Sequence, residues 1–214
     1  MRRLSRLLAL LLGFAAFAVG AEEPVTPAQK LKGLLSQLAS IEATFVQATM
    51  DAEKRTAQES SGQLWVRNPA QFRIETTAPF VQTLVSDGTS LWTFDADLEQ
   101  VIVGVLDKDL EQVPVLLLGG AAERIESEYE IAFYASEDLD HFVLVPTNPA
   151  SLFERLELEF KGGVPFALSI SDSIGQHTRI RFSDVQINTE SGEGRFTFEP
   201  PAGVDVIDDR PGKL

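Results

Sequence analysis

Hydrophobic residues recur at helical spacing most strongly in one stretch near the start of the chain. Leu31, Leu34, Leu35 and Leu38 follow at i, i+3, i+4 and i+7, which places all four on one helical face. The preceding Thr-Pro-Ala-Gln sequence, residues 26–29, is a capping box with proline at the first helical position. The pattern predicts a helix that begins after residue 26 and ends near residues 39–40.

Beyond this helix hydrophobic and polar residues alternate, which is the period of a strand with one buried face. Alternating segments run from Phe45–Met50 to Arg195–Phe198, and the polar stretch between residues 51 and 62 reads as a loop. Connections such as Ser86–Thr89 have the composition of tight turns. These features predict an antiparallel sheet of about ten to eleven strands rather than βαβ units.

The apolar face of such a sheet must curl or be covered, because an open greasy face would aggregate. Two segments are available as cover: the N-terminal helix and the run VPVLLLGG, Val113–Gly120, which is too short to cross a bilayer. These two segments are too small to fill the concave side densely. We therefore expect a mainly β (α+β) fold, an incomplete antiparallel β-barrel whose interior is only loosely filled.

The first residues have the layout of a secretory signal peptide. Arg2, Arg3 and Arg6 precede an apolar run, Leu7–Val19, and small residues follow it. We expect cleavage after residue 21, which leaves residues 22–214 as a single exported domain. The alternative is an N-terminal membrane anchor, for which the apolar run is short.

Charge and cysteine content exclude several classes of partner and chemistry. The net charge of the chain is −14, and removing the predicted signal peptide takes away three arginines and no acidic residue. Nucleic acid is therefore not an expected partner, because phosphate binding needs a basic face. The chain has no cysteine, which excludes disulfides, thiol catalysis, zinc–thiolate sites and an acylated N-terminal cysteine. We expect a protein that is not inserted in a membrane.

The chain offers few residues for catalysis. His141 and His177 both fall in or beside predicted strands, without a nucleophile-elbow or metalloprotease pattern. Acidic clusters such as Asp95, Asp97 and Glu99 lack the glycine and the spacing of a calcium loop. We expect no catalytic site, no metal site and no cofactor, and hence a protein that is not an enzyme.

Five segments, in order along the chain, carry a resemblance to a known family. They are ATFVQ with Phe45 and Gln47, GQLWVRNPAQFRIETTAP (62–79), VSDGTSLWTFDADLEQV (85–101), VPVLLL (113–118) and FTFEPPAGVDVID (196–208). Together they resemble the LolA family of periplasmic outer-membrane lipoprotein carriers. The resemblance covers nearly the whole of the expected mature chain.

The resemblance implies both a fold and a set of partners. Members of this family have an incomplete barrel with a helical lid and an apolar cavity. They accept acylated lipoproteins from the inner-membrane ABC transporter LolCDE and deliver them to the outer-membrane acceptor LolB. LolB shares the fold but is itself a lipoprotein, so the missing cysteine favours the soluble carrier, here expected to be a monomer. The alternative is a carrier or sensor of another lipid or amphiphile on the same fold.

The resemblance also assigns residues to the cavity and to the lid. The run at residues 113–120 becomes a lid helix with leucines toward the cavity, although a permanently packed core helix is the alternative. The side of the sheet that Trp65 faces is not determined from the sequence. The residues assigned to the acyl-chain cavity are Phe45, Trp65, Phe72, Ile74, Leu91, Leu116 and Leu117, and those assigned to lid closure are Arg67, Asn68, Pro114, Leu118 and Gly119.

Two positions depart from the family pattern. The family often has an arginine directly before the proline of the LWVRNPAQF stretch, where it hydrogen-bonds to the lid. Asn68 stands there in this chain and Arg67 lies one residue earlier, where a strand side chain would point to the opposite face. An asparagine donor forms a weaker hydrogen bond than a charged one. The second departure is Ile74, where the family commonly has an aromatic residue.

Overall fold

Twelve strands form one continuous sheet in the computed structural model, which describes residues 25–53, 55–106, 114–119, 122, 124–192 and 194–211. The strands lie side by side in the order β12-β6-β5-β4-β3-β2-β1-β11-β10-β9-β8-β7. Neighbours are antiparallel, except that β12 runs parallel to β6. The strand bounds are β1 Ser40–Met50, β2 Thr56–Arg67, β3 Gln71–Ala78, β4 Gln82–Asp87, β5 Ser90–Asp95, β6 Gln100–Val105, β7 Tyr129–Ser136, β8 Leu139–Pro146, β9 Phe153–Lys161, β10 Val164–Asp172, β11 His177–Ile187 and β12 Asp205–Asp208.

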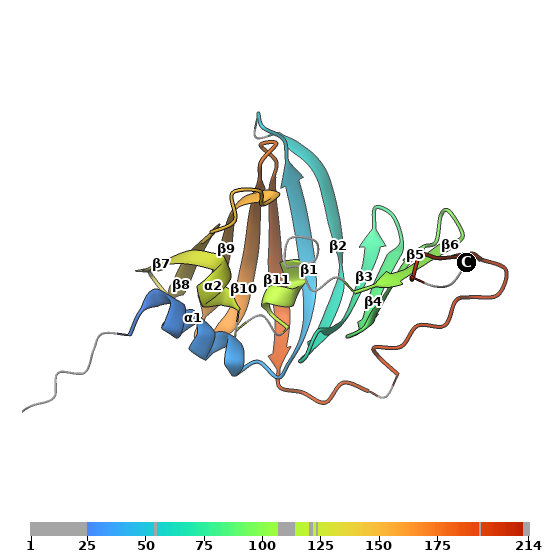
Figure 1. Cartoon of the computed structure of the whole chain (residues 1–214), viewed down its shortest axis with the longest axis horizontal. Helices are drawn as coiled ribbons and strands as arrows, with labels where there is room; N and C mark the ends of the chain where they lie inside the picture. Colours follow the sequence, from blue (N-terminus) through green and yellow to red (C-terminus); the bar gives the residue numbers. More distant parts are fainter. Residues whose placement is uncertain are drawn as a thin grey trace, which may run out of the picture.

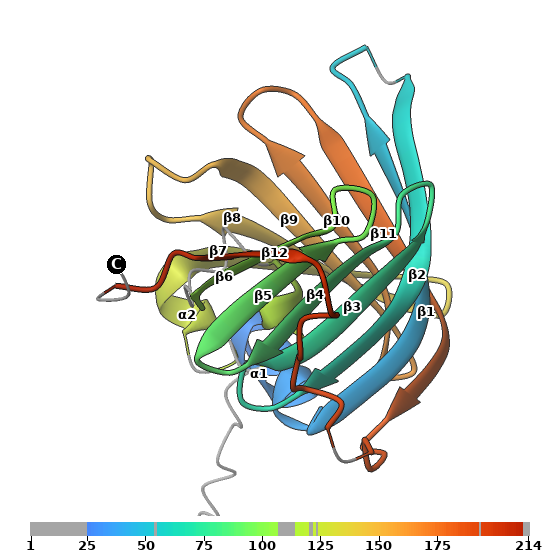
Figure 2. The same cartoon turned by 90° about the vertical axis from the view of Figure 1, so that its right-hand side faces the viewer.

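The sheet curls into a deep arch whose two ends do not join (Figures 1 and 2). The edge strands β7 and β12 each pair with one neighbour, so the barrel is incomplete. The predicted fold class is therefore confirmed, with twelve strands in place of ten to eleven. One predicted strand was wrong: residues 195–198 form no strand, and the last strand is Asp205–Asp208.

The first two strands are longer than their apolar patterns. β1 and β2 pair from Ser40↔Arg67 to Met50↔Thr56, with one shift of register next to Met50, so most of the predicted loop between residues 51 and 62 is strand. The extension was not predicted because its side chains are polar and show no apolar alternation. Backbone pairing of strands does not require an apolar face. Gly62 lies where β2 approaches β3 closely, and a Cβ at this position would collide with the Glu75 carbonyl.

Helix α1, Pro27–Ser36, begins where the sequence predicts. The Gln29 N–H donates to Thr26 Oγ1 at 3.2 Å and the Thr26 N–H donates to Gln29 Oε1 at 3.0 Å, so both arms of the capping box are present. The helix ends at Ser36, earlier than the expected residues 39–40, because Gln37 caps it. Lys30 holds α1 to the sheet through an ion pair with Asp140, 3.1 Å away, and lies 3.6 Å from the Phe133 ring centroid.

Two short helices complete the cover. They are the 3₁₀ helix η1, Pro114–Leu117, and α2, Ile125–Glu128, which packs against α1. The helices lie inside the arch, between its β2–β6 half and its β7–β10 half (Figure 2). Leu31, Leu35 and Leu38 are at most 3% exposed and belong to the main core cluster. The core therefore lies between the helices and one end of the concave face.

Within the described residues, no helix is both long enough and apolar enough to span a membrane. The predicted signal peptide, residues 1–21, lies outside the described residues.

Candidate functional site

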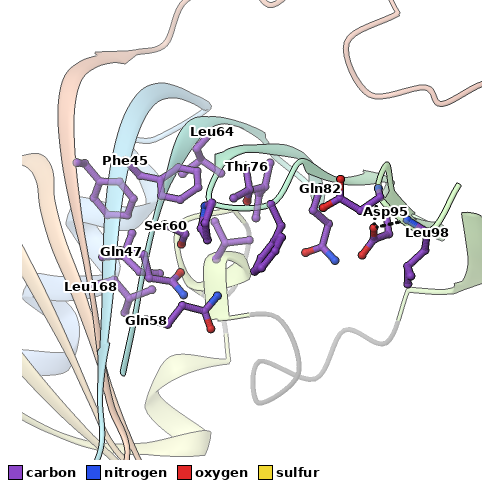
Figure 3. A pocket seen from close by; sticks show the side chains of 17 residues that line it. Phe45, Gln47, Gln58, Ser60, Leu64, Thr76, Gln82, Asp95, Leu98 and Leu168 are labelled. Carbon is purple, nitrogen blue, oxygen red and sulfur yellow. Dashed lines mark hydrogen bonds between the residues drawn. The ribbon is translucent and has the colours of Figure 1, made fainter. Parts of the chain in front are cut away.

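A cavity of about 550 Å³ lies on the concave face of the sheet beside the core. Strands β1 to β5, β10 and β11, η1 and two turns contribute its walls. Figure 3 shows Phe45, Leu64 and Leu168 near β1 and β2, with Gln82, Asp95 and Leu98 at the far end. The volume falls within the roughly 300–1,000 Å³ of pockets that bind drug-sized ligands. The sheet therefore has a hollow as well as a core on its concave side.

The part of the cavity nearest the core is apolar and buried. Phe45, Leu64, Leu168 and Phe182 line it with exposed fractions of 1–6%. Period-two spacing on their strands brings these side chains to the same face. Such a wall offers non-directional contacts, which hold hydrocarbon without specifying its shape.

The opposite part of the cavity is polar and carries no basic side chain. Five uncharged polar residues line it, and Asp95, Asp97 and the exposed side chains Phe80 and Leu98 complete the opening. No lysine, arginine or histidine lines the cavity in the described part of the chain. We call the five uncharged residues the polar margin: Gln47, Gln58, Ser60, Thr76 and Gln82.

The short helix η1 contributes to the core and to the cavity through different residues. Val115 lines the cavity, whereas Leu116, Leu117 and Leu118 are at most 4% exposed and belong to the core cluster. Pro114 begins η1, and Val113 and Gly120 lie outside the described residues. The leucines assigned to the cavity and the lid thus pack together in the core beside it.

Backbone contacts fix the end of the lid segment, residues 114–119, to the turn between β2 and β3. The Ala70 N–H donates to the Gly119 carbonyl at 2.9 Å. A Cβ on Gly119 would lie 2.5 Å from Cγ1 of Val66, so the approach of the two segments requires glycine. Gly119 does not have a positive φ, and its small size is what the packing uses.

The remaining residues predicted for the cavity separate into three groups. Phe45 and Ile74 line the cavity. Phe72 is 0% exposed in the core, and Leu91 is half-buried against that core. Trp65 is 3% exposed but is absent from both the cavity wall and the core cluster, because it lies on the outer face of β2.

Residues 194–198, which we call the C-terminal strap, cover this outer face. The Arg195 guanidinium lies 4.3 Å from the Trp65 ring centroid, and the Arg67 guanidinium lies 4.5 Å from that of Phe196. Arg67 also donates from Nε to Gln71 Oε1 at 2.8 Å. Arg67 therefore faces the strap, and its described partners are outside the arch. Figure 2 shows the chain from β11 crossing this side of the sheet to reach β12.

Asn68 binds near the end of α1 instead of η1. Its Nδ2 donates to the Leu38 carbonyl at 2.6 Å, and its backbone N–H donates to the Ala39 carbonyl at 3.0 Å. Its Oδ1 is buried and has no hydrogen-bond partner among the described residues. Asn68 thus joins the β2–β3 turn to the segment that follows α1.

The two histidines lie away from the cavity. His141 stacks on Tyr134 with ring centroids 4.6 Å apart, and His177 Nδ1 lies 2.9 Å from Ser171 Oγ beside an exposed hairpin turn. The described residues contain no cluster of three or more histidine, aspartate and glutamate side chains that would hold a metal ion. One bidentate ion pair lies on the sheet away from the cavity: Arg179 donates to both oxygens of Glu159 at 2.8 and 2.9 Å, which raises the pKa of the guanidinium.

The polar margin and the exposed residues at the opening were missed in the sequence. The sequence signal for the margin was its position: these residues continue the alternate, inward-facing positions of the strands beyond the apolar part. Gln58 and Ser60 continue the inward positions of Leu64, while Thr76 continues those of Ile74. Extending each apolar pattern by one or two periods would have placed these residues on the cavity face.

Comparisons with known proteins identify the family. The family model for "Outer membrane lipoprotein carrier protein LolA" matches residues 36–199. An outer-membrane lipoprotein carrier protein of Chromohalobacter salexigens is 38% identical over 192 residues, which cover 90% of this chain and 91% of that protein. Its namesake from Pseudomonas aeruginosa is 39% identical over 197 residues, covering 90% and 95%.

A solved structure shows the same fold at low sequence identity. The crystal structure of an uncharacterized conserved protein from Thermus thermophilus superposes with a TM-score of 0.56 at 15% identity, covering 86% of this chain and 99% of that one. The family match spans the cavity wall, the lid and the strap. The chain belongs to the LolA family of outer-membrane lipoprotein carrier proteins.

Proposed function

We propose that this protein shelters the acyl chains of lipoproteins in its cavity and carries them through the periplasm to the outer membrane. Members of its family are carriers and not enzymes. The observation that supports the proposal best is a hollow whose buried end is lined by apolar side chains of several strands.

The size of the hydrophobic effect explains why a carrier is needed. Moving one methylene out of water is worth about 0.8 kcal/mol, so an acyl chain of about a dozen methylenes is worth around 10 kcal/mol. A multiply acylated protein therefore does not leave a bilayer unaided. A partly filled cavity accepts such chains through contacts that do not depend on their exact length.

We further propose that the donor is an ABC transporter of the LolCDE type and the acceptor is LolB at the outer membrane. The carrier acts as a monomer that a signal peptide directs to the periplasm. The acidic surface supports this part of the proposal, because it disfavours adsorption to anionic bilayers and leaves transfer to docking with protein partners.

The test is release of radiolabelled lipoproteins from spheroplasts of the source bacterium. The wild-type mature protein is expected to release them into the soluble fraction as a complex with itself. Ile180→Glu places a charge in the apolar wall and is expected to abolish release, whereas Arg181→Glu, the next residue and exposed on the outer face, retains it.

As a control, both variants must first unfold in a cooperative transition with a measurable midpoint, which shows that they are folded. Absence of release by the wild type, or equal release by the two variants, would contradict the proposal.

A further inference from the structure

The residues of the polar margin lie on the cavity face of four adjacent strands, β1 to β4. Gln47 on β1 pairs with Ser60 on β2, and Thr76 on β3 pairs with Gln82 on β4. Gln58 lies one inward position beyond Ser60 along β2. Cross-strand partners have adjacent side chains on one face of a sheet. Five uncharged polar side chains thus line one hollow, as two cross-strand pairs with Gln58 beside the first pair.

The side chains of this patch are not used by the fold. None of the five makes a side-chain hydrogen bond to another described residue. Gln47, Ser60 and Thr76 are half-buried, so a molecule that filled the cavity would remove them from water. Buried polar groups without partners are costly, and the occupant is therefore required to offer hydrogen-bonding groups of its own at this place.

The chemistry of the patch restricts which groups fit. Glutamine amides and the hydroxyls of serine and threonine both donate and accept hydrogen bonds, which matches ester and amide groups. A phosphodiester would require a cation, because a desolvated anion is compensated only by opposite charge or by strong donors. No basic residue lines the described cavity, and the carboxylates of Asp95 and Asp97 at its opening repel an anion.

We propose that the polar margin is a headgroup subsite that accepts neutral ester- and amide-linked headgroups and rejects anionic phospholipids. This inference rests on the proposed function, since it takes the acyl chains to fill the apolar end of the cavity. The carrier thereby distinguishes an acylated protein from the bulk lipid that surrounds it, although both offer the same hydrocarbon.

The inference is tested by displacement of a fluorescent monoacylglycerol from the purified mature protein. One competitor is a diacylated cysteinyl peptide with acetylated and amidated ends, which carries no charge, and the other is phosphatidylglycerol with the same two acyl chains, both in mixed detergent micelles. The lipopeptide is expected to displace the probe at a concentration at least about tenfold lower than phosphatidylglycerol. Gln58→Arg, which adds a cation to the margin, is expected to improve displacement by phosphatidylglycerol several-fold.

Gln63→Arg is the matched control, because it adds the same charge to the same strand on the exposed outer face. Gln82→Arg replaces Gln58→Arg if that variant does not fold. Equal displacement by the two competitors overturns headgroup selection and leaves acyl binding intact. Unchanged selectivity in the folded margin variant, or the same shift in Gln63→Arg, overturns the assignment to these residues. Failure of the probe to bind the wild type contradicts the proposed function itself.

Discussion

Two neighbouring inward positions on β3 have different roles. Phe72 is 0% exposed and belongs to the core, whereas Ile74 is half-buried and lines the cavity. The two residues are one strand period apart, so the boundary between core and hollow passes between them. Residues of the same chemical kind therefore stabilise the fold on one side of this boundary and are available to a ligand on the other.

Truncating these two residues is expected to separate stability from binding. Phe72→Ala removes a fully buried ring and is expected to lower the free energy of unfolding by about 3–5 kcal/mol. Ile74→Ala is expected to cost less than about 2 kcal/mol, because its side chain already borders open space, while it weakens binding of an acyl probe. Urea unfolding and fluorescence titration measure the two effects. A larger loss of stability in Ile74→Ala than in Phe72→Ala would show that the boundary between core and cavity does not lie between these two residues.

Gly119 allows the lid to approach β2. Gly119→Ala is expected to destabilise the protein by about 1–3 kcal/mol, because the new methyl group would lie 2.5 Å from Cγ1 of Val66. Val66→Ala in the same chain removes that contact, so the double variant is expected to recover part of the loss. Urea unfolding of the two single variants and the double variant gives the coupling energy. Strictly additive losses would show that the clash is relieved in another way.

At the scale of elements, the C-terminal strap covers an aromatic and cationic surface on the outside of β2. Phe196 is 3% exposed, and the Arg67 guanidinium lies over its ring. The ring centroids of Phe94 and Phe198 are 5.9 Å apart. Trp65 is thereby buried on the side away from the cavity. The strap thus gives the β2–β5 half of the sheet an outer layer, in addition to the helices inside the arch.

Loosening the strap is expected to expose Trp65 without affecting the cavity. In a Trp92→Phe background, Phe196→Ala is expected to increase quenching of Trp65 fluorescence by acrylamide and to cost about 3 kcal/mol of stability. Affinity for an acyl probe is expected to stay unchanged, because Trp65 does not line the cavity. Thr197→Ala, an exposed position in the same segment, serves as the control. A large loss of probe affinity in Phe196→Ala would connect the strap to the binding site.

The sequence predicted elements with a regular apolar period well and elements without one poorly. The four leucines of α1 and its capping box placed that helix, and alternation identified most strands. β12 was missed because it has four residues, and its parallel pairing with β6 depends on a distant segment. The side that Trp65 faces and the partner of Asn68 depend on tertiary contacts, with the strap and with Leu38, that no local pattern contains.

At the scale of the whole molecule, charge sets how the carrier meets a membrane. The full chain has a net charge of −14, and the mature protein, which lacks three of its arginines, is more acidic still; it is expected to stay off vesicles of phosphatidylglycerol at low and at high salt. Flotation on a density gradient measures this, with neutral phosphatidylcholine vesicles as the control. Flotation with the anionic vesicles that salt reverses would reveal a basic surface able to dock on lipid directly.

The two edge strands of the sheet, β7 and β12, are not joined to each other, so the sheet is open and differs mechanically from a closed barrel. A closed barrel has a diameter that is set by the number and tilt of its strands, and it cannot widen without breaking interstrand hydrogen bonds. Among the described residues β7 and β12 each pair with one neighbour only, so no ladder of interstrand hydrogen bonds fixes the distance between these two edges. The sheet alone therefore does not restrict the width of the concave side to a single value.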